Sequence, residues 1–328
     1  MKRHYLTLLM KTIVSVAFLT IVFQQVDLIQ AWENFQDLDP VFIIYALIFY
    51  GCLQWLSCIR WQVILSLTGY HLATYQLIGS YFAGMFLNIF LPGALGGDIY
   101  RVYQVTKSTN DSEAALVSVF LERFTGLVAL STMALIGLVP AIDLIGRHDI
   151  VALFLGCVAA LVGGTLAIAS PQLLMFLSPI LKKLRLIGIM ARMAKIQSLL
   201  IQFIQHRETL LMSMGLSLLL QIAIVYYHYL IVQQLGISIS FFELLVFIPI
   251  VVVITMLPIS LGGLGLKEGL WVYLFVRTGS TADQALLLSL TLMILSWLLS
   301  LPGAIILLLN TTRWKKLDSV SMSRSVKS

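Results

Sequence analysis

Charged residues are scarce in this sequence: Asp, Glu, Lys and Arg together make up only 11% of its 328 residues. Soluble domains contain about 25% charged and roughly 45–50% apolar residues. Hydrophobic residues here reach 59%, and the mean hydropathy is +0.97. This composition excludes an ordinary soluble domain and predicts an all-α, polytopic bundle of transmembrane helices.

Cysteine is also rare, and the residue patterns that hold metals or perform catalysis are missing. Cys52, Cys58 and Cys157 lie apart within apolar segments, with no CxxC spacing and no His partner. They do not indicate a metal site, and we interpret them as small packing residues. The sequence also contains no P-loop and no convincing pair of nucleophile and base. We therefore expect no cofactor, no metal and no catalytic residue, and a protein that is not an enzyme.

The 21 basic residues, against 15 acidic ones, gather in short clusters between apolar runs. Such clusters normally fix orientation in a bilayer, so we do not expect a nucleic-acid partner. Lys2, Arg3 and Lys11 precede an apolar run, 12–26, which we interpret as a retained span because no signal-peptide cleavage site follows it. The basic clusters predict an inner-membrane protein whose two termini and loop 182–207 are cytoplasmic.

One motif occurs twice, about half the chain length apart. The first copy begins at Leu91 and reads LPGALGGDIYR, and the second begins at Leu257 and reads LPISLGGLGLK. They share LPxxLGG and end in a base at the same place, Arg101 and Lys267. Pro and paired Gly break a helix, and irregular backbone at membrane depth persists only where protein or a water-filled cavity covers it. Two such breaks in matching halves are typical of inverted-repeat transporters.

We expect each copy to form the tip of a helical hairpin that enters the membrane and returns on the same side. The hairpins comprise residues 72–103 and 241–277, and they must enter from opposite faces because the most basic loop would otherwise lie outside. Six full spans and two opposed re-entrant hairpins result. A full crossing before Pro92 stays open as an alternative, because about 17 helical residues reach about 25 Å.

All spans are expected to belong to one flippase-like domain, 1–312, followed by a basic cytoplasmic tail without much structure, 313–328. The domain divides into halves of about 1–170 and 209–312, joined by a cytoplasmic amphipathic segment, 171–208. Apolar residues in this segment recur at helical spacing and predict a helix on the cytoplasmic leaflet: Ile189, Met193, Ile196, Leu200 and Phe203. A connector packed on the bundle is the alternative.

The start of the helix after each tip has the properties of an anion site, because its first N–H groups are unpaired and carry partial positive charge. Arg101 and Lys267 would add formal charge beside a shared cavity. The alternative is a tight turn at the membrane face, with both bases acting as interfacial anchors. The acids beside these bases, Asp98 and Glu268, predict a salt bridge in each hairpin or, alternatively, a proton carrier.

Another acidic and basic pair, Glu122-Arg123, faces the bundle interior if its helix begins near Ala114, and is interfacial if the span begins at Phe124. His228 is interpreted as a hydrogen-bonded packing residue. The candidate substrate-binding residues are Pro92, Gly96, Gly97, Asp98, Arg101, Glu122, Arg123, Pro258, Gly262, Gly263, Lys267 and Glu268.

Four features taken together resemble a known family: Arg60-Trp61, Asn88 with the first copy, Glu122-Arg123, and the second copy. The sequence resembles the lysylphosphatidylglycerol synthase transmembrane region family, the flippase-like membrane domain also found in the bacterial multiple peptide resistance factor. The resemblance runs from about residue 5 to residue 310. It implies a bacterial or archaeal inner-membrane protein related to lipid flippases. In the resistance factor a soluble aminoacyl-transferase domain follows, whereas only a short tail follows here, so we do not expect lipid aminoacylation.

These observations favour a transporter that moves an anionic lipid or a polyprenyl phosphate-linked substrate between leaflets, with the head group held at the two tips. A membrane-embedded enzyme that modifies such a lipid is one alternative. Another is a scaffold for a separate lipid synthase or glycosyltransferase, in which the hairpins are purely structural.

Overall fold

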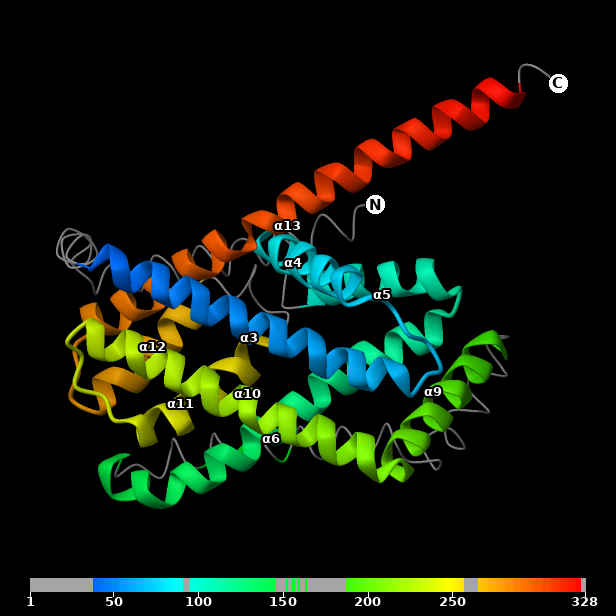
Figure 1. Cartoon of the computed structure of the whole chain (residues 1–328). Helices are drawn as coiled ribbons and strands as arrows, with labels where there is room; N and C mark the ends of the chain where they lie inside the picture. The colour runs from blue at the N-terminus through cyan, green and yellow to red at the C-terminus, as the bar shows by residue number, and fades with distance from the viewer. Residues whose placement is uncertain are drawn as a thin grey trace, which may run out of the picture.

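The computed structural model describes residues 38–90, 95–145, 187–256 and 265–325, with five isolated positions between 152 and 163. These ranges contain helices and no strand (Figure 1). The helices in chain order are α3 (Pro40–Ser66), α4 (Thr74–Phe90), α5 (Leu95–Thr109), α6 (Ser112–Ile145), α9 (Ile187–Gln205), α10 (Arg207–Gln234), α11 (Phe241–Met256), α12 (Leu266–Arg277) and α13 (Ala282–Ser325).

Four helices are long and apolar enough to cross a membrane, which confirms a polytopic helical membrane protein. They are α3, the Ser112–Gly137 part of α6, α10, and the Ala282–Leu309 part of α13, each 26 to 28 residues long. At 1.5 Å per residue they reach about 40 Å, more than the roughly 30 Å hydrocarbon core. The span expected at 12–26 lies outside the described residues.

Local sequence signals set several helix ends. Asp39 precedes Pro40 at the start of α3, and its Oδ1 accepts a hydrogen bond of 2.9 Å from the N–H of Val41. At the start of α11, Ser240 and Glu243 exchange side chain to backbone hydrogen bonds of 2.7 and 3.2 Å, which is a capping box. The start of α11 agrees with the expected start of the second hairpin at residue 241.

The end of α10 also follows a local rule. Gly236 has φ +65° directly after this helix, a conformation that a Cβ would disfavour. The N–H of Ile237 then bonds to the carbonyl of Val232 at 3.0 Å. The turn expected near this glycine is present.

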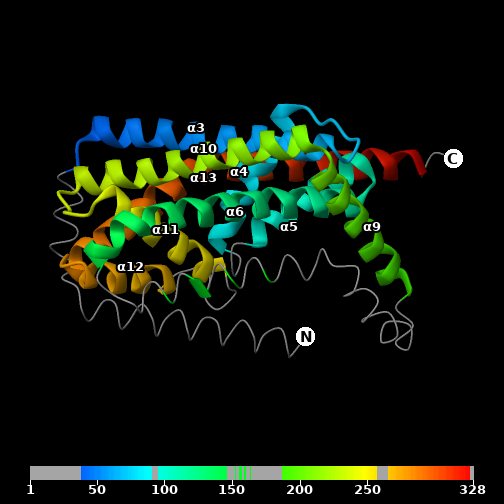
Figure 2. The ribbon, with the colours of Figure 1, turned by 90° about the horizontal axis from the view of Figure 1, so that it is seen from below.

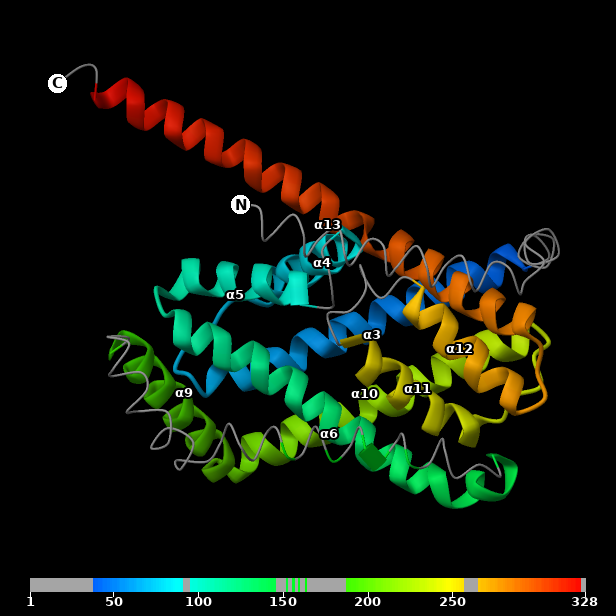
Figure 3. The same cartoon turned by 180° about the vertical axis from the view of Figure 1, so that it is seen from behind.

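The long helices run side by side along the length of the bundle. Helices α3 and α10 pack together, and α6 crosses against both of them and against α11 (Figures 1 and 2). Seen from behind, α11 and α12 lie next to each other, and α12 packs on the first part of α13 (Figure 3). The largest apolar core joins α3, α6, α10, α11, α12 and α13. Helices α4 and α5 pack on one another and against α13 and α6 respectively.

Each motif copy separates two helices, as the Pro and Gly residues predict. Helix α4 has 17 residues and α5 begins at Leu95, whereas α12, after the second copy, has only 12 residues. The tips themselves, 91–94 and 257–264, lie outside the described residues. The re-entrant course and the inverted repeat stay predictions, because they depend on where the bilayer lies.

Helices α4 and α5 touch through their backbones. A Cβ added to Gly97 would clash with the carbonyl oxygen of Gly84 and would lie 2.8 Å from the side-chain nitrogen of Asn88. A Cβ on Gly303 of α13 would likewise clash with the carbonyl oxygen of Phe82 on α4. Close backbone contacts at glycines therefore join α4 to α5 within the first hairpin and α4 to α13 outside it.

The segments outside the core depart from the expectations in part. In α9, Leu200 and Phe203 pack on three apolar side chains of α3 and α6. This contact favours the alternative of a connector packed on the bundle for these two residues, and the place of α9 on the cytoplasmic leaflet stays a prediction. The tail, expected to have little structure, continues α13 to Ser325 because no Gly or Pro follows Gly303 within the helix.

Candidate functional site

Five charged side chains from three helices form a buried network. Glu122 of α6 is its centre: its Oε2 accepts a hydrogen bond of 3.0 Å from Nη1 of Arg101 on α5, and its Oε1 pairs with Nη2 of Arg60 on α3. Asp98 accepts from Nη1 of Arg101 at 3.2 Å. Asp98 also accepts hydrogen bonds from Nε and Nη2 of Arg123 at 2.9 and 3.0 Å. Each carboxylate thus binds two arginines: Glu122 binds Arg60 and Arg101, and Asp98 binds Arg101 and Arg123.

Four of the five residues are almost fully removed from solvent. The residue exposures are 1% for Glu122, 2% for Arg101, 6% for Arg60 and 8% for Asp98. Because α6 begins at Ser112, Glu122 lies about 15 Å along this helix. Of the two placements left open for Glu122-Arg123, the structure therefore has the interior one for Glu122.

Adjacent positions on α6 reach different partners because successive helical residues point about 100° apart. Glu122 turns towards Arg60 and Arg101, whereas Arg123 turns towards Asp98. Asp98 and Arg101 are three residues apart on α5 and share one face of that helix. The salt bridge expected in the first hairpin is confirmed.

Two aromatic rings enclose the Arg101 guanidinium. Its Cζ lies 4.0 Å from the ring centroid of Trp61 and 4.2 Å from that of Tyr81. The rings are themselves fixed, since Trp61 donates to Ser118 at 3.2 Å and the Tyr81 hydroxyl lies 3.3 Å from Glu122 Oε1. Cation–π contacts of this kind stabilise a desolvated guanidinium by about 2 kcal/mol.

The network has an excess of positive charge. Three guanidinium groups face two carboxylates; Arg60 and Arg101 are buried, whereas the Arg123 side chain is 38% exposed. Charged groups at such depth are costly unless partners compensate them. In the described part of the chain, Arg60 Nε, Arg101 Nε and Arg101 Nη2 are buried and have no hydrogen-bond partner. Arg60 Nη1 donates to Ser217 of α10 at 3.2 Å. The network therefore has unused donors and an uncompensated positive charge.

These properties fit the binding of acceptor oxygens. Both carboxylates are occupied by guanidinium groups, as the distances above show. Across 38–90, 95–145, 187–256 and 265–325, no group of three or more His, Cys, Asp or Glu side chains could hold a metal ion. Guanidinium N–H groups bind carboxylate or phosphate oxygens in a planar, bidentate manner.

Sequence reasoning did not single out Arg60 of the network or the two rings that enclose Arg101. Arg60 entered only as part of the family resemblance, but α3 continues to Ser66 and carries Arg60 inside the bundle. Trp61 entered only as part of the family resemblance, and Tyr81 was not singled out. The available signal for Arg60 was that apolar residues resume directly after it, as Trp61, Val63 and Ile64.

The start of α5 differs from the expected anion site. The N–H of Gly97 donates to Oδ1 of Asn88 on α4 at 2.6 Å, so the hairpin itself occupies this amide. Gly96 and Gly97 are both buried, and Pro92 lies outside the described residues. The expectation that a free Gly97 amide faces a ligand was wrong, because Asn88 lies opposite it across the α4–α5 contact.

In the second copy, Glu268 has a structural role. Its Oε2 accepts from the N–H of Gly265 at 2.7 Å, and its Oε1 accepts from Ser289 at 3.2 Å. Glu268 thus caps α12 and ties it to α13, and among the described residues it forms no ion pair with Lys267. The salt bridge expected here was wrong, because the carboxylate at the third position of a helix reaches back to the helix start.

The described residues do not bring the second copy into the charged network. Neither Lys267 nor Glu268 has a described hydrogen bond or ion pair with the five network residues, and Pro258, Gly262 and Gly263 lie outside the described residues. His228, on α10, lies 2.8 Å from the carbonyl of Ile224 through Nδ1 and packs beside Trp271. This hydrogen bond confirms the interpretation of His228 as a packing residue.

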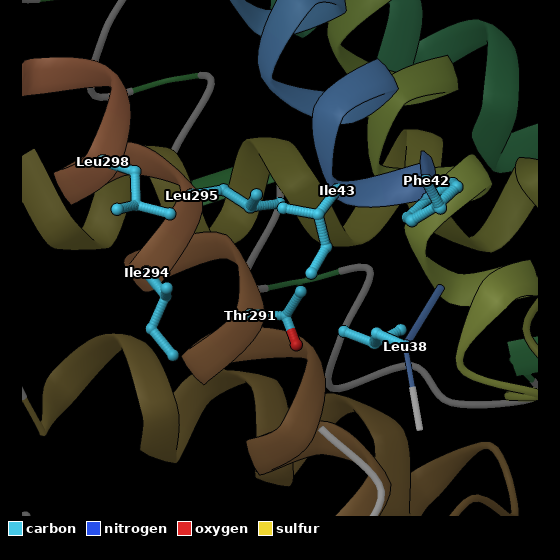
Figure 4. A pocket seen from close by; sticks show the side chains of 7 residues that line it. All are labelled: Leu38, Phe42, Ile43, Thr291, Ile294, Leu295 and Leu298. Carbon is cyan, nitrogen blue, oxygen red and sulfur yellow. The ribbon is translucent and has the colours of Figure 1, made fainter. Parts of the chain in front are cut away.

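A separate cavity of about 260 Å³ lies between the start of α3 and α13 (Figure 4). Its lining is apolar apart from Thr291, whose hydroxyl has no hydrogen-bond partner in the described ranges. No residue of the charged network lines it; the lining residues are Leu38, Phe42, Ile43, Thr291, Ile294, Leu295 and Leu298. The cavity offers no charged group for recognition.

Two comparisons agree with this architecture. The sequence profile of the lysylphosphatidylglycerol synthase TM region matches residues 8–303. The chain is also similar to a UPF0104 membrane protein of Pyrococcus horikoshii, with 22% identity over 301 aligned residues that cover 83% of this chain and 88% of the relative. The family match extends over nearly the whole helical bundle, and it includes both motif copies and all five residues of the charged network. This integral membrane protein therefore belongs to the lysylphosphatidylglycerol synthase TM region family.

Proposed function

We propose that this protein is a flippase-like transporter of the inner membrane that moves an anionic lipid or a polyprenyl phosphate-linked substrate between leaflets. The observation that carries the proposal is the network of Arg60, Asp98, Arg101, Glu122 and Arg123, in which three guanidinium groups meet two carboxylates and three buried N–H donors of Arg60 and Arg101 have no described partner. An anionic head group would compensate that charge, and its oxygens would accept from the unused guanidinium donors.

The location of the network supports transport more than a surface role. Charged residues within membrane spans are expensive and usually mark substrate or ion pathways. Interactions between charges in a low-dielectric site exceed those in water several-fold. A family described by the membrane region of a lipid synthase is also consistent with a lipid substrate.

The described contacts support unequal roles for the two halves. Arg101 has its place in the network, whereas Lys267 has no described link to it. We propose that Arg101, held by Trp61 and Tyr81, is the principal head-group ligand, with Arg60 and Arg123 beside it. Lys267 serves as a separate positive charge on the second hairpin.

The test is lipid transport by purified protein in liposomes that contain a fluorescent anionic lipid and, separately, a zwitterionic lipid. Arg101→Gln should abolish most movement of the anionic lipid, and Arg101→Lys should also impair it because an ammonium cannot replace the planar fork. Arg207→Gln, at an exposed position at the start of α10, is the matched control and should transport as the parent does.

Lys267→Gln tests the second hairpin in the same assay and should give a smaller loss than Arg101→Gln. Size-exclusion chromatography in detergent shows whether each variant is folded. If folded Arg101→Gln moves anionic lipid at the parental rate, the network is structural, as in a scaffold. Chemical conversion of the lipid by the parent would instead indicate the enzyme alternative.

A further inference from the structure

Helix α9 packs against α6 near the end of α3 (Figures 1 and 3). Leu200 and Phe203 of α9 are 6% and 2% exposed, and they pack with Ile64 of α3 and with Val117 and Leu121 of α6. Two apolar side chains of α9 thus cover this end of the α3–α6 contact.

The closed end lies directly beside the charged network. Ile64 is one helical turn beyond Arg60 on α3, and Leu121 immediately precedes Glu122 on α6. Ser118 lies on α6 between the residues that contact α9 and the charged network. It is fully buried, accepts a hydrogen bond from Trp61, and is one turn before Glu122. The α9 contact is therefore the next layer of side chains outside the network on this side.

An ion pair holds α9 in place. Nζ of Lys195 lies 2.8 Å from both carboxylate oxygens of Asp111 and 3.7 Å from Glu113, just before and at the start of α6. Asp111 is fixed by two further donors, the N–H of Ala114 at 3.0 Å and the hydroxyl of Tyr70 at 3.3 Å. The Lys195 side chain is 45% exposed, so this pair is one that can open in water.

The connection to α10 allows α9 to turn as a unit. His206 is the single residue between the two helices; it has φ −80° and ψ 79°, and it provides no side-chain cap for α10. A change of φ at this exposed residue turns α9 and leaves in place the hydrogen bond of 2.9 Å from the N–H of Leu210 to the His206 carbonyl. On α10, Ser217 accepts from Arg60, so the fixed side of this hinge is tied to the network.

We propose that α9 is a gate over the charged network, with Leu200 and Phe203 as its seal, Lys195 as its latch and His206 as its hinge. In the structure the gate is closed. Its opening gives the network access to the side of the membrane on which α9 lies. The purpose of the gate rests on the proposed function. The movement of α9 itself changes the access of water-soluble reagents to the network, and this access can be measured without any transport.

The experiment uses Ser118→Cys as a reporter in the full chain after Cys52, Cys58 and Cys157 have been replaced by Ala. Purified protein is treated with a small water-soluble methanethiosulfonate reagent, and the rate of modification is followed by mass spectrometry. Labelling should be slow with the parental α9. Lys195→Glu replaces attraction to Asp111 by repulsion and should raise the rate roughly fivefold, the scale of an exposed ion pair.

Two controls accompany this variant. Lys195→Arg keeps the charge and should label at the parental rate, and Arg207→Glu makes the same charge reversal at an exposed position with no described ion pair. A second disruption, Leu200→Ala, thins the seal without changing charge and should also accelerate labelling. Detergent size-exclusion chromatography confirms that each variant is folded.

If the folded Lys195→Glu and Leu200→Ala variants both label Ser118→Cys at the parental rate, α9 is a fixed cover and the gate is wrong. Accelerated labelling with both variants supports the gate. Failure of the parent to move anionic lipid, together with accelerated labelling, would overturn the proposed function and leave the gate in place.

Discussion

Glu122 compensates two guanidinium groups at once, and its substitution is the most direct way to measure what the network contributes to stability. Glu122→Gln should lower the free energy of unfolding by about 3–5 kcal/mol, because removing one partner leaves buried charges unpaired. Thermal unfolding in detergent measures this, with Glu208→Gln at an exposed position of α10 as the control. An unchanged melting temperature for Glu122→Gln would show that water or lipid already compensates both arginines.

The ion pair of Asp111 and Lys195 predicts how the stability of single-residue variants depends on pH. Burial opposes its charged form, but the N–H of Ala114 and the Lys195 ammonium outweigh burial, and the pKa of Asp111 is lowered from its usual 3.8. The hydrogen bond to Asp111 in turn raises the pKa of Lys195 from 10.5. Between about pH 5 and pH 10 both groups stay charged in the folded and unfolded chains, so the stabilisation by their pair is constant there.

A group with a lowered pKa loses its stabilising contribution only when the pH falls through that lowered value. The difference in unfolding free energy between the parent and Lys195→Met should therefore be about 1 kcal/mol or less, constant from pH 5 to pH 9, and smaller below about pH 4. Melting curves across this range test it. A difference that is already lost near neutral pH would contradict the pairing of Lys195 with Asp111.

At the scale of elements, the α4–α5 hairpin depends on the absence of a side chain at Gly97. Gly97→Ala places a methyl group against the carbonyl of Gly84 and the side chain of Asn88, so the two helices must move apart. We expect the amount of folded protein to fall, with a cost of about 1–3 kcal/mol for overpacking. Yield in the membrane and the melting temperature measure it.

Gly215→Ala is the matched control, because a Cβ at this position of α10 meets nothing within 4 Å. It should be neutral or slightly stabilising, since Ala is the better helix former by about 1 kcal/mol. The larger side chain of Gly97→Val meets the same backbone contact, so we expect it to reduce both folded protein and transport. Equal yields for the two alanine variants would contradict the close α4–α5 contact.

At the scale of the whole molecule, the basic clusters predict which face of the bundle is cytoplasmic. Cysteine at Ser198, an exposed position of α9, should react with an impermeant thiol reagent only after the inner membrane is opened. Cysteine at Asp39, exposed before α3, should react from the outside in spheroplasts. Labelling of Ser198→Cys from outside would contradict both the topology and the opposed hairpins.

The sequence by itself determined the class of the protein, most helix boundaries and the doubled motif. These features depend on local properties: hydropathy over about 20 residues, the effect of Pro and paired Gly on a helix, and the balance of charge between spans. The starts of α3 and α11, the ends of α10 and α12, and the breaks after Phe90 and Met256 were accessible for this reason. The resemblance to the family rested on the same motifs and is confirmed by the match to residues 8–303.

The tertiary structure alone decided the partners of the charged residues. Arg60 and Glu122 are far apart in the sequence and meet because α3 and α6 cross, while Glu268 turns back to cap its own helix instead of pairing with Lys267. Leu200 and Phe203 were correctly placed on one face of a helix, and the structure shows that these two side chains pack on α3 and α6. Amphipathicity shows which side chains leave water; whether protein or lipid receives them depends on the shape of the neighbouring helices, which no local pattern contains.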